Sequence, residues 1–256
     1  GGELTEGAVD EQIRHSITKM SYLHFCSTEL YCKRIIQMGE DPSRVFNSGA
    51  PGIDNIVNLD LLSKDKLEEN LDWKFSSKSA LFTYHPVTLG KNDIPRDLKV
   101  ILNVLIKTNI NVLFTYANAD NGGRFINQKI EEFCRLDPIK YKVVKSLGQL
   151  KYLSAMKHTD LLIGNTSSGI IEAASFGKPV VNIGDRQKGR LKGNNVIDCN
   201  LDTLESSINL AISGDFKEIS QNTHNIYGVG IASDIILNEL VEQEVFVTKK
   251  FIDSIP

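Results

Sequence analysis

The sequence has little cysteine and no long apolar run. Its four cysteines, Cys26, Cys32, Cys134 and Cys199, form no C-x-x-C pair, and its five histidines do not cluster along the chain. This pattern predicts neither a disulfide framework nor a metal site, and buried reduced thiols favour a cytoplasmic protein. No apolar stretch approaches the ~18 residues that a membrane-spanning helix needs, so no membrane partner is expected.

An excess of charge of one sign is also missing. The 256 residues include 29 Lys and Arg against 32 Asp and Glu, a net charge of −3, and 41% of the residues are hydrophobic. A nucleic-acid binder usually presents a strongly basic face, so no nucleic-acid partner is expected and a small ligand is favoured. The length and composition are those of a globular protein with one large domain or two modest ones.

The first part of the chain begins with Gly1-Gly2-Glu3 rather than with Met or a targeting segment, and we expect it to continue a longer protein. Apolar periodicity predicts a helix at 8–21, a strand at 22–26, a helix between Thr28 and Gly39, and a strand at 45–46. One charged amphipathic helix is predicted at 53–71, with a domain boundary near residue 75. The expected domains are therefore 1–74 and 75–256.

Beyond residue 75, strands and helices alternate. The predicted strands are 80–84, 111–115, 141–145, 161–164, 180–183 and 195–197. The predicted helices are 95–108, 123–136, 149–157, 168–176, 201–212 and a closing helix at 231–241. Apolar strands that are each followed by a helix predict an α/β fold with a parallel sheet covered on both faces. Ligands of such sheets bind beyond the carboxyl ends of the strands.

The strongest local signal lies at one such strand end, in the segment from Gly164 to Gly169. Ser167, Ser168 and Gly169 are small residues at a predicted helix start, where main-chain N–H groups can approach a phosphate closely. Glu172, one turn further on, can accept hydrogen bonds from the vicinal hydroxyls of a ribose. A plain capped helix with a surface glutamate remains the alternative.

Other strand ends carry further candidates. Arg186 follows the predicted strand 180–183 and can neutralise a diphosphate, whereas Lys188 and Lys192 in the same loop are expected to be solvated. His85 precedes Pro86 at the end of the strand 80–84 and can donate to a phosphate or transfer a proton, with a structural role as the alternative. The polar loop with Asn118 and Asp120 is either a binding loop or plain turn chemistry.

The entry segment contributes carboxylates. Asp10 and Glu11 stand just inside the first predicted helix, after a glycine-rich loop. Such carboxylates can serve as general acid and base if they face a cleft, and otherwise simply favour the start of the helix.

Taken in order, these segments resemble the UDP-N-acetylglucosamine 2-epimerases, especially the hydrolysing branch that serves sialic acid and related nonulosonates. The matching segments are Gly1-Gly2-Glu3-Leu4-Thr5-Glu6-Gly7, Asp10-Glu11-Gln12-Ile13-Arg14-His15, Thr83-Tyr84-His85-Pro86, Asn165-Thr166-Ser167-Ser168-Gly169-Ile170-Ile171-Glu172 and Gly184-Asp185-Arg186-Gln187-Lys188-Gly189-Arg190. The resemblance implies a GT-B architecture, in which two Rossmann-like halves face each other across a cleft.

The resemblance also implies a reaction and its residues. Family members eliminate UDP to give a 2-acetamidoglycal and add water to release N-acetylmannosamine, without a metal or redox cofactor. By this resemblance Ser167, Ser168 and Glu172 would bind the diphosphate and ribose, Arg186 the phosphate side, and His85 the diphosphate or the leaving-group oxygen, as a binding or catalytic residue. Asp10, with Glu11, would be an acid or base. Gly169, Asn118 and Asp120 complete the residues that we expect at the UDP site. A homodimer or homotetramer is implied as well.

Complete members carry a further N-terminal segment, so this chain by itself is expected to bind nucleotide with negligible turnover. The non-hydrolysing branch, another GT-B enzyme acting on a UDP-sugar, and an inactive binding fragment remain alternatives.

Overall fold

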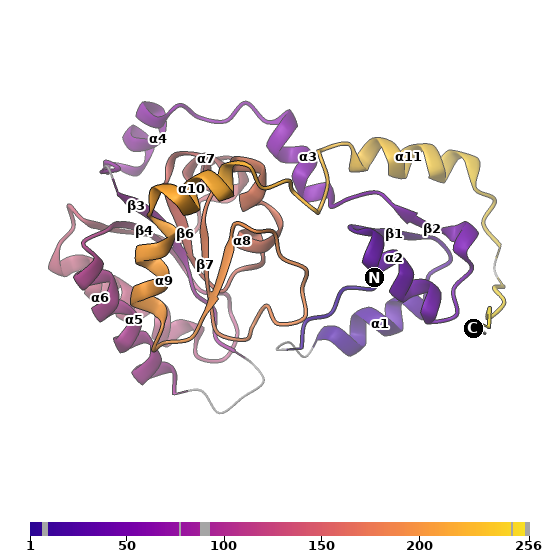
Figure 1. Cartoon of the computed structure of the whole chain (residues 1–256), viewed down its shortest axis with the longest axis horizontal. Coiled ribbons are helices and arrows are strands. Elements are labelled where there is room, and N and C mark those ends of the chain that lie inside the picture. The colour runs from indigo at the N-terminus through magenta and orange to yellow at the C-terminus, as the bar shows by residue number, and fades with distance from the viewer. Residues whose placement is uncertain (7–9, 77, 88–92, 247, 254–256) are drawn as a thin grey trace.

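The chain folds into a larger part, built around a six-stranded sheet, and a smaller part that contains the N-terminus (Figure 1). This computed structural model describes residues 1–6, 10–76, 78–87, 93–246 and 248–253, without the side chain of Asp10. The predicted helix positions 8 and 9 therefore lie outside the described residues.

The larger sheet is parallel throughout, with the strand order β5-β4-β3-β6-β7-β8. Its strands are β3 (Ser79–Thr83), β4 (Asn111–Thr115), β5 (Tyr141–Val144), β6 (Leu161–Gly164), β7 (Val180–Ile183) and β8 (Val196–Cys199). The six predicted strands and their parallel arrangement are confirmed, with ends that differ by one or two residues.

Alternating side chains along each strand bury the two faces of this sheet against different helices. Ala80 and Phe82 belong to the cluster that includes α5 (Ile94–Thr108), α6 (Gly123–Leu136) and α9 (Leu204–Ala211). Leu81, between them, belongs to the cluster that includes α4 (Lys64–Leu71) and α7 (Gly148–His158). Successive side chains of a strand point to opposite faces, so an unbroken apolar strand supplies both cores.

The smaller part consists of two parallel strands and the helices around them. It contains α1 (Asp10–Met20), β1 (His24–Cys26), α2 (Glu29–Gln37), β2 (Val45–Asn47) and α3 (Pro51–Asn58). Thr28 caps α2 as predicted, because its side chain accepts a hydrogen bond from the N–H of Tyr31. The C-terminal helix α11 (Ala232–Glu242) returns to this part and packs on α3 (Figure 1).

Two helix predictions need correction, and one helix was missed. The single helix at 53–71 is wrong: Leu59 has extended backbone angles, and Ser63 caps a second helix, α4, by accepting from the N–H of Lys66. The helix at 168–176 is instead α8 (Ser167–Ile171), followed by the 3-10 turn η2 (Ala173–Phe176). A helix that we did not predict, α10 (Gly214–Gln221), begins after the capping side chain of Ser213.

None of the helices within the described residues combines the length and apolar composition needed to span a bilayer. The domain boundary near residue 75 stays a prediction.

Candidate functional site

The candidate site lies where the strand order of the large sheet reverses. The chain proceeds outward from β3 through β4 to β5, then returns to the other side of β3 with β6 and continues through β7 to β8. Crevices beyond the carboxyl ends of the strands at such a reversal are the usual ligand sites of α/β sheets. Here β3 leads to His85 and β6 leads to Asn165.

Gly164 lets these two strands end close together. Its φ is +139°, and a Cβ built on it would lie 1.9 Å from the carbonyl oxygen of Thr83. Only glycine fits this backbone angle and this approach, since any side chain would push β6 away from β3. The glycine thus allows the next residue, Asn165, to reach the main chain of His85.

Asn165 is fully buried and holds His85 from both sides of its backbone. Its Oδ1 accepts from the N–H of His85 at 2.7 Å, and its Nδ2 donates to the carbonyl oxygen of His85 at 2.9 Å. The carbonyl oxygen of Asn165 accepts from Arg186 Nη1 at 3.1 Å and from Gln187 Nε2 at 2.8 Å. The structure therefore brings the predicted residues His85 and Arg186 together around one asparagine.

The environment of His85 fixes its protonation at neutral pH. Burial lowers the pKa of His85 most, and the positive charge of Arg186 lowers it further. Asp120 acts in the opposite direction, and the resulting pKa is about 4. The Nδ1 atom accepts from the N–H of Asn118 at 3.0 Å. The neutral ring must therefore carry its proton on Nε2, which makes that nitrogen a hydrogen-bond donor.

Asn118 and Asp120, the candidates of the polar loop after β4, lie beside this histidine. Asn118 Nδ2 donates to Asp120 Oδ2 at 2.5 Å. Two buried acceptors, Asn118 Oδ1 and Gln187 Oε1, find no hydrogen-bond partner within the described residues. Buried polar atoms are normally paired, so these two oxygens are exceptions that lie in the cluster around Asn165 and His85.

Ser167, Ser168 and Gly169 open α8 directly after this cluster. Ser168 Oγ lies 2.5 Å from the hydroxyl of Tyr152 and 3.3 Å from that of Thr166. Because α8 has only five residues, its dipole is small. Favourable electrostatics for an anion must therefore come largely from Arg186.

Glu172 follows α8 and lies at the junction of the two parts. A Cβ built on Gly52, in α3, would come within 3.4 Å of Glu172 Oε1. Burial raises the pKa of Glu172 to about 7. Within the part of the chain that the structure describes, no charged group offsets this desolvation, a pattern that is frequent at ligand sites.

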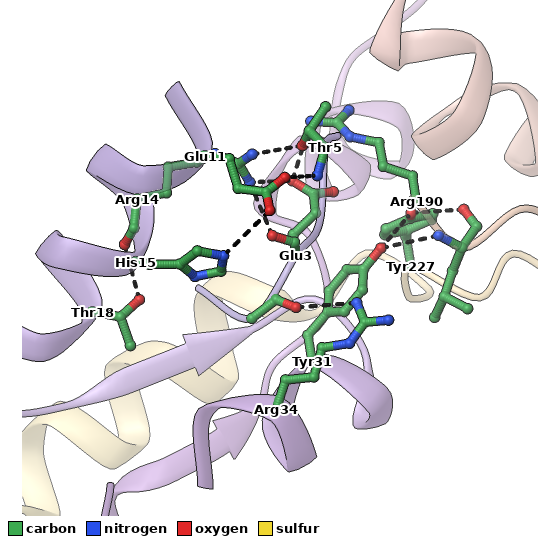
Figure 2. A network of polar contacts seen from close by, with 12 residues as sticks. Glu3, Thr5, Glu11, Arg14, His15, Thr18, Tyr31, Arg34, Arg190 and Tyr227 are labelled. Atoms are coloured by element: carbon green, nitrogen blue, oxygen red, sulfur yellow. Dashed lines mark hydrogen bonds and ion pairs between the residues drawn. The ribbon is translucent and has the colours of Figure 1, made fainter. Parts of the chain in front are cut away.

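The first helix carries the remaining predicted residues. Glu11 Oε2 accepts from the N–H of Thr5 at 2.5 Å, and its Oε1 lies 3.7 Å from His15 Nε2 (Figure 2). Asp10 begins α1, but its side chain lies outside the described residues. The catalytic roles of Asp10 and Glu11 stay predictions.

A second network links this helix to the loop that carries Arg186. Glu3 Oε2 lies 3.3 Å from Arg14 Nη1 and 3.1 Å from Arg190 Nη2, so one carboxylate bridges two arginines (Figure 2). In the same loop the carbonyl oxygen of Lys188 accepts from the N–H of Glu6 at 3.1 Å. Residues 186–190 therefore touch Asn165 at one end and the N-terminal segment at the other.

Sequence reasoning missed several of these residues. Asn165 and Gln187 stood inside the quoted motifs, but a buried amide that orders a site leaves no mark in residue spacing. Glu3 and Arg190 are 187 residues apart, and only the fold brings them together. The available signal was the sequence of Gly164 and Asn165 at a strand end, because a glycine there allows the following side chain a close approach.

No group of three or more His, Cys, Asp or Glu side chains suited to a metal ion occurs among the described residues.

Comparison with known proteins agrees with the resemblance. The GDP/UDP-N,N'-diacetylbacillosamine 2-epimerase (hydrolyzing) of Campylobacter jejuni is 45% identical over 219 residues, which are 85% of this chain and 57% of that protein. The UDP-N,N'-diacetylbacillosamine 2-epimerase (hydrolyzing) of Legionella pneumophila is 34% identical over 91% of this chain and 61% of its own length. This chain thus spans about three fifths of each of these two relatives.

Solved structures give the same answer for the fold. The UDP-GlcNAc 2-epimerase from Neisseria meningitidis bound to UDP-GlcNAc matches 93% of this chain and 66% of that chain, with a TM-score of 0.76 at 18% identity. The predicted GT-B type of α/β fold is confirmed. A family model described as UDP-N-acetylglucosamine 2-epimerase matches residues 1–241, and this chain belongs to that family.

Proposed function

We propose that the protein containing this chain is a hydrolysing UDP-sugar 2-epimerase. It would eliminate UDP from the substrate, hydrate the resulting 2-acetamidoglycal, and release N-acetylmannosamine or a related 2-epimerised sugar for nonulosonate synthesis. The observation that carries this proposal is the convergence of His85 and Arg186 on Asn165, directly before the serines of α8. The names of the two hydrolysing relatives support this branch of the family.

The geometry supports a division of roles within this proposal. Arg186 and the N–H groups near Ser167, Ser168 and Gly169 face the diphosphate, and Glu172 accepts the ribose hydroxyls. His85 presents a proton on Nε2 to the oxygen that links the sugar to the diphosphate, where negative charge develops as the bond breaks. The main-chain N–H of Asn118 holds the imidazole, and Asp120 accepts from the Asn118 side chain.

The two chemical steps need groups on both sides of the sugar. In the elimination the C1–O bond to UDP and the C2–H bond break, and in the hydration a hydroxyl adds to C1 and a proton to C2 from the opposite face. Asp10 and Glu11 are the proposed acid and base for the proton transfers at C2. The homodimer or homotetramer is part of the same proposal, and light scattering on the full-length protein checks it.

Turnover by the full-length protein tests the function. We expect incubation with UDP-N-acetylglucosamine, or in parallel with its 2,4-diacetamido-2,4,6-trideoxy analogue, to release UDP and the free 2-epimerised sugar in equal amounts. Reversible epimerisation with the nucleotide still attached would instead place the protein in the non-hydrolysing branch. Release of UDP only after addition of a sugar acceptor would indicate a glycosyltransferase.

A binding function without turnover is the remaining alternative. For the 256-residue chain alone we expect UDP binding by calorimetry and negligible turnover. Full-length protein that binds UDP but converts neither sugar would favour the binding function, and absence of UDP binding would contradict both.

A further inference from the structure

All polar atoms of Asn165 are engaged in hydrogen bonds at the candidate site. Its N–H donates to the carbonyl oxygen of Thr83 at 3.1 Å, its carboxamide binds both backbone groups of His85, and its carbonyl oxygen accepts from Arg186 and Gln187. The side chain is completely buried. None of these atoms is left to bind a ligand directly.

The chemistry of the carboxamide explains why an asparagine stands there. A main-chain N–H and C=O of one residue need one acceptor and one donor side by side, which a carboxamide supplies and a carboxylate does not. A serine has one oxygen, and a glutamine is one methylene longer. The residue type and the preceding Gly164 are therefore matched to the task of holding His85.

A purely structural purpose explains these contacts less well. Strands β3 and β6 already pair from Ala80–Leu161 to Thr83–Gly164 without the side chain of Asn165. The carboxamide binds His85, which lies two residues after the end of β3. At this point the chain no longer pairs with the sheet, and the predicted ligand site begins. The bonds thus order the site rather than the sheet.

We propose that Asn165 is a positioning residue: its carboxamide fixes the backbone of His85, and its carbonyl oxygen fixes Arg186, so that both face the same bound diphosphate. This inference rests on the proposed function. It predicts that the state of the imidazole depends on an amide that never touches the substrate.

The titration of His85 in the free 256-residue chain is the first test, measured by NMR of the imidazole C–H signals. Asn165→Asp retains the shape but replaces the donor with a carboxylate oxygen, so we expect the pKa of His85 to rise by about 1 to 3. The other charged groups that act on the ring, Arg186 and Asp120, are the same in both proteins. An unchanged titration in a folded variant would overturn the proposal.

A matched control exists directly before β8, an edge strand of the sheet. Asn195 is also buried, and its Nδ2 donates to the carbonyl oxygen of Lys178 at 2.9 Å, far from His85 in the sheet order. We expect Asn195→Asp to lower the melting temperature while leaving the titration of His85 unchanged. An equal rise of the His85 pKa in both variants would show a general loss of packing and would also overturn the proposal.

Kinetics of the full-length protein give the second test. We expect Asn165→Ser, which adds no charge, to lower kcat about 100-fold, because a displacement of a reacting group by ~1 Å has that effect. The dissociation constant for UDP should change much less, since the carbonyl oxygen that holds Arg186 remains. Equal losses in UDP affinity and kcat would contradict the proposed split.

The tests separate this inference from the proposed function. The titration needs no nucleotide, so a wild-type protein without epimerase activity would refute the function and leave the effect on His85 measurable. Conversely, an active wild-type enzyme whose His85 pKa does not change in the Asn165 variants would refute only the positioning role. Asn165→Ser, which is small and uncharged, separates positioning from the charge that Asn165→Asp adds. We expect the pKa of His85 to rise in this variant too, because the ring loses its fixed, buried place, and a rise confined to Asn165→Asp would overturn the proposal. If Asn165→Asp does not fold, Asn165→Ser carries the titration alone.

Discussion

Two buried polar clusters in this molecule treat their charges in opposite ways. In the smaller part, Glu40 is 1% exposed and accepts from Lys19 at 2.5 Å, Lys249 at 2.7 Å and His24 at 3.0 Å. Burial acts to raise the pKa of Glu40, but these hydrogen bonds outweigh it and hold the pKa at about 2. This carboxylate is fully paired inside the protein.

At the candidate site the groups remain short of partners. Burial holds the pKa of His85 at about 4 and that of Glu172 at about 7, so both groups shift toward their neutral forms. The acceptors Asn118 Oδ1 and Gln187 Oε1 have no partner among the described residues. A saturated ion cluster stabilises a fold, whereas desolvated groups with shifted pKa values and unpaired acceptors are a common feature of ligand sites.

The largest expected effect breaks the saturated cluster. Glu40→Gln keeps the shape of the side chain but leaves Lys19 and Lys249 without their counter-charge, so we expect the free energy of unfolding at pH 7 to fall by about 3 kcal/mol. Chemical denaturation measures it. The C-terminal segment 248–253 should also become more sensitive to protease. Two contacts hold it in place: the pairing of Lys249 with Glu40, which the variant weakens, and the hydrogen bond from Ile252 N–H to the Gly39 carbonyl oxygen.

The pH dependence of this effect has a defined sign. The pKa of Glu40 is lowered from 4.5 to about 2, so its stabilisation is complete above 4.5 and is lost as the pH falls through about 2. The matched control is Glu132→Gln, which removes a surface carboxylate bonded to Lys129 and should leave the unfolding curve unchanged. Equal destabilisation by both variants would contradict the distinction between the clusters.

The second prediction removes the cation of the candidate site. We expect Arg186→Gln to weaken UDP binding to the 256-residue chain by about 10- to 100-fold, or about 2 kcal/mol, because a charge-assisted hydrogen bond to the diphosphate is lost. Calorimetry measures this affinity. The control is Lys188→Gln in the same loop, since Lys188 is exposed and pairs with Glu6.

The Lys188 variant should bind UDP within about twofold of the wild type. Comparable losses of UDP affinity in both variants would mean that the loop attracts UDP only by its net charge. They would contradict the direct contact between Arg186 and the diphosphate.

Most of the fold could be predicted from the sequence, because apolar strands such as 161–164 and 180–183 bury both of their faces and stand out as short unbroken runs. The error at 53–71 has a local cause. Residues 53–71 have helical periodicity, but the extended backbone at Leu59 and the cap at Ser63 interrupt it, and a periodicity argument gives little weight to a single capping residue.

The candidate site was predicted only in part. His85 and Arg186 were found because histidine and arginine at strand ends are chemically conspicuous, and their loops had to meet at one edge of a parallel sheet. Asn165 was not assigned a role, since a buried amide gains its meaning from the two backbone groups that it meets. The bridge from Glu3 to Arg190 depends on how the two parts of the chain pack, which no local pattern reports.

The smallest expected effect sharpens the comparison from the side of the candidate site. Burial raises the pKa of Glu172 from 4.5 to about 7, so the folded protein binds more protons than the unfolded chain between these values, and stability falls as the pH rises through that window.

Glu172→Gln removes this cost. We expect the variant to exceed the wild type by about 1–2 kcal/mol at pH 8 and to match it at pH 4, since partial exposure reduces the full effect. Denaturation of both proteins at the two pH values measures the difference, with the exposed Glu205→Gln as a control that should stay within about 0.5 kcal/mol of the wild type. A difference independent of pH would mean that Glu172 is already charged and solvated in the free protein, and the candidate site would then resemble an ordinary surface more than the desolvated cluster described above.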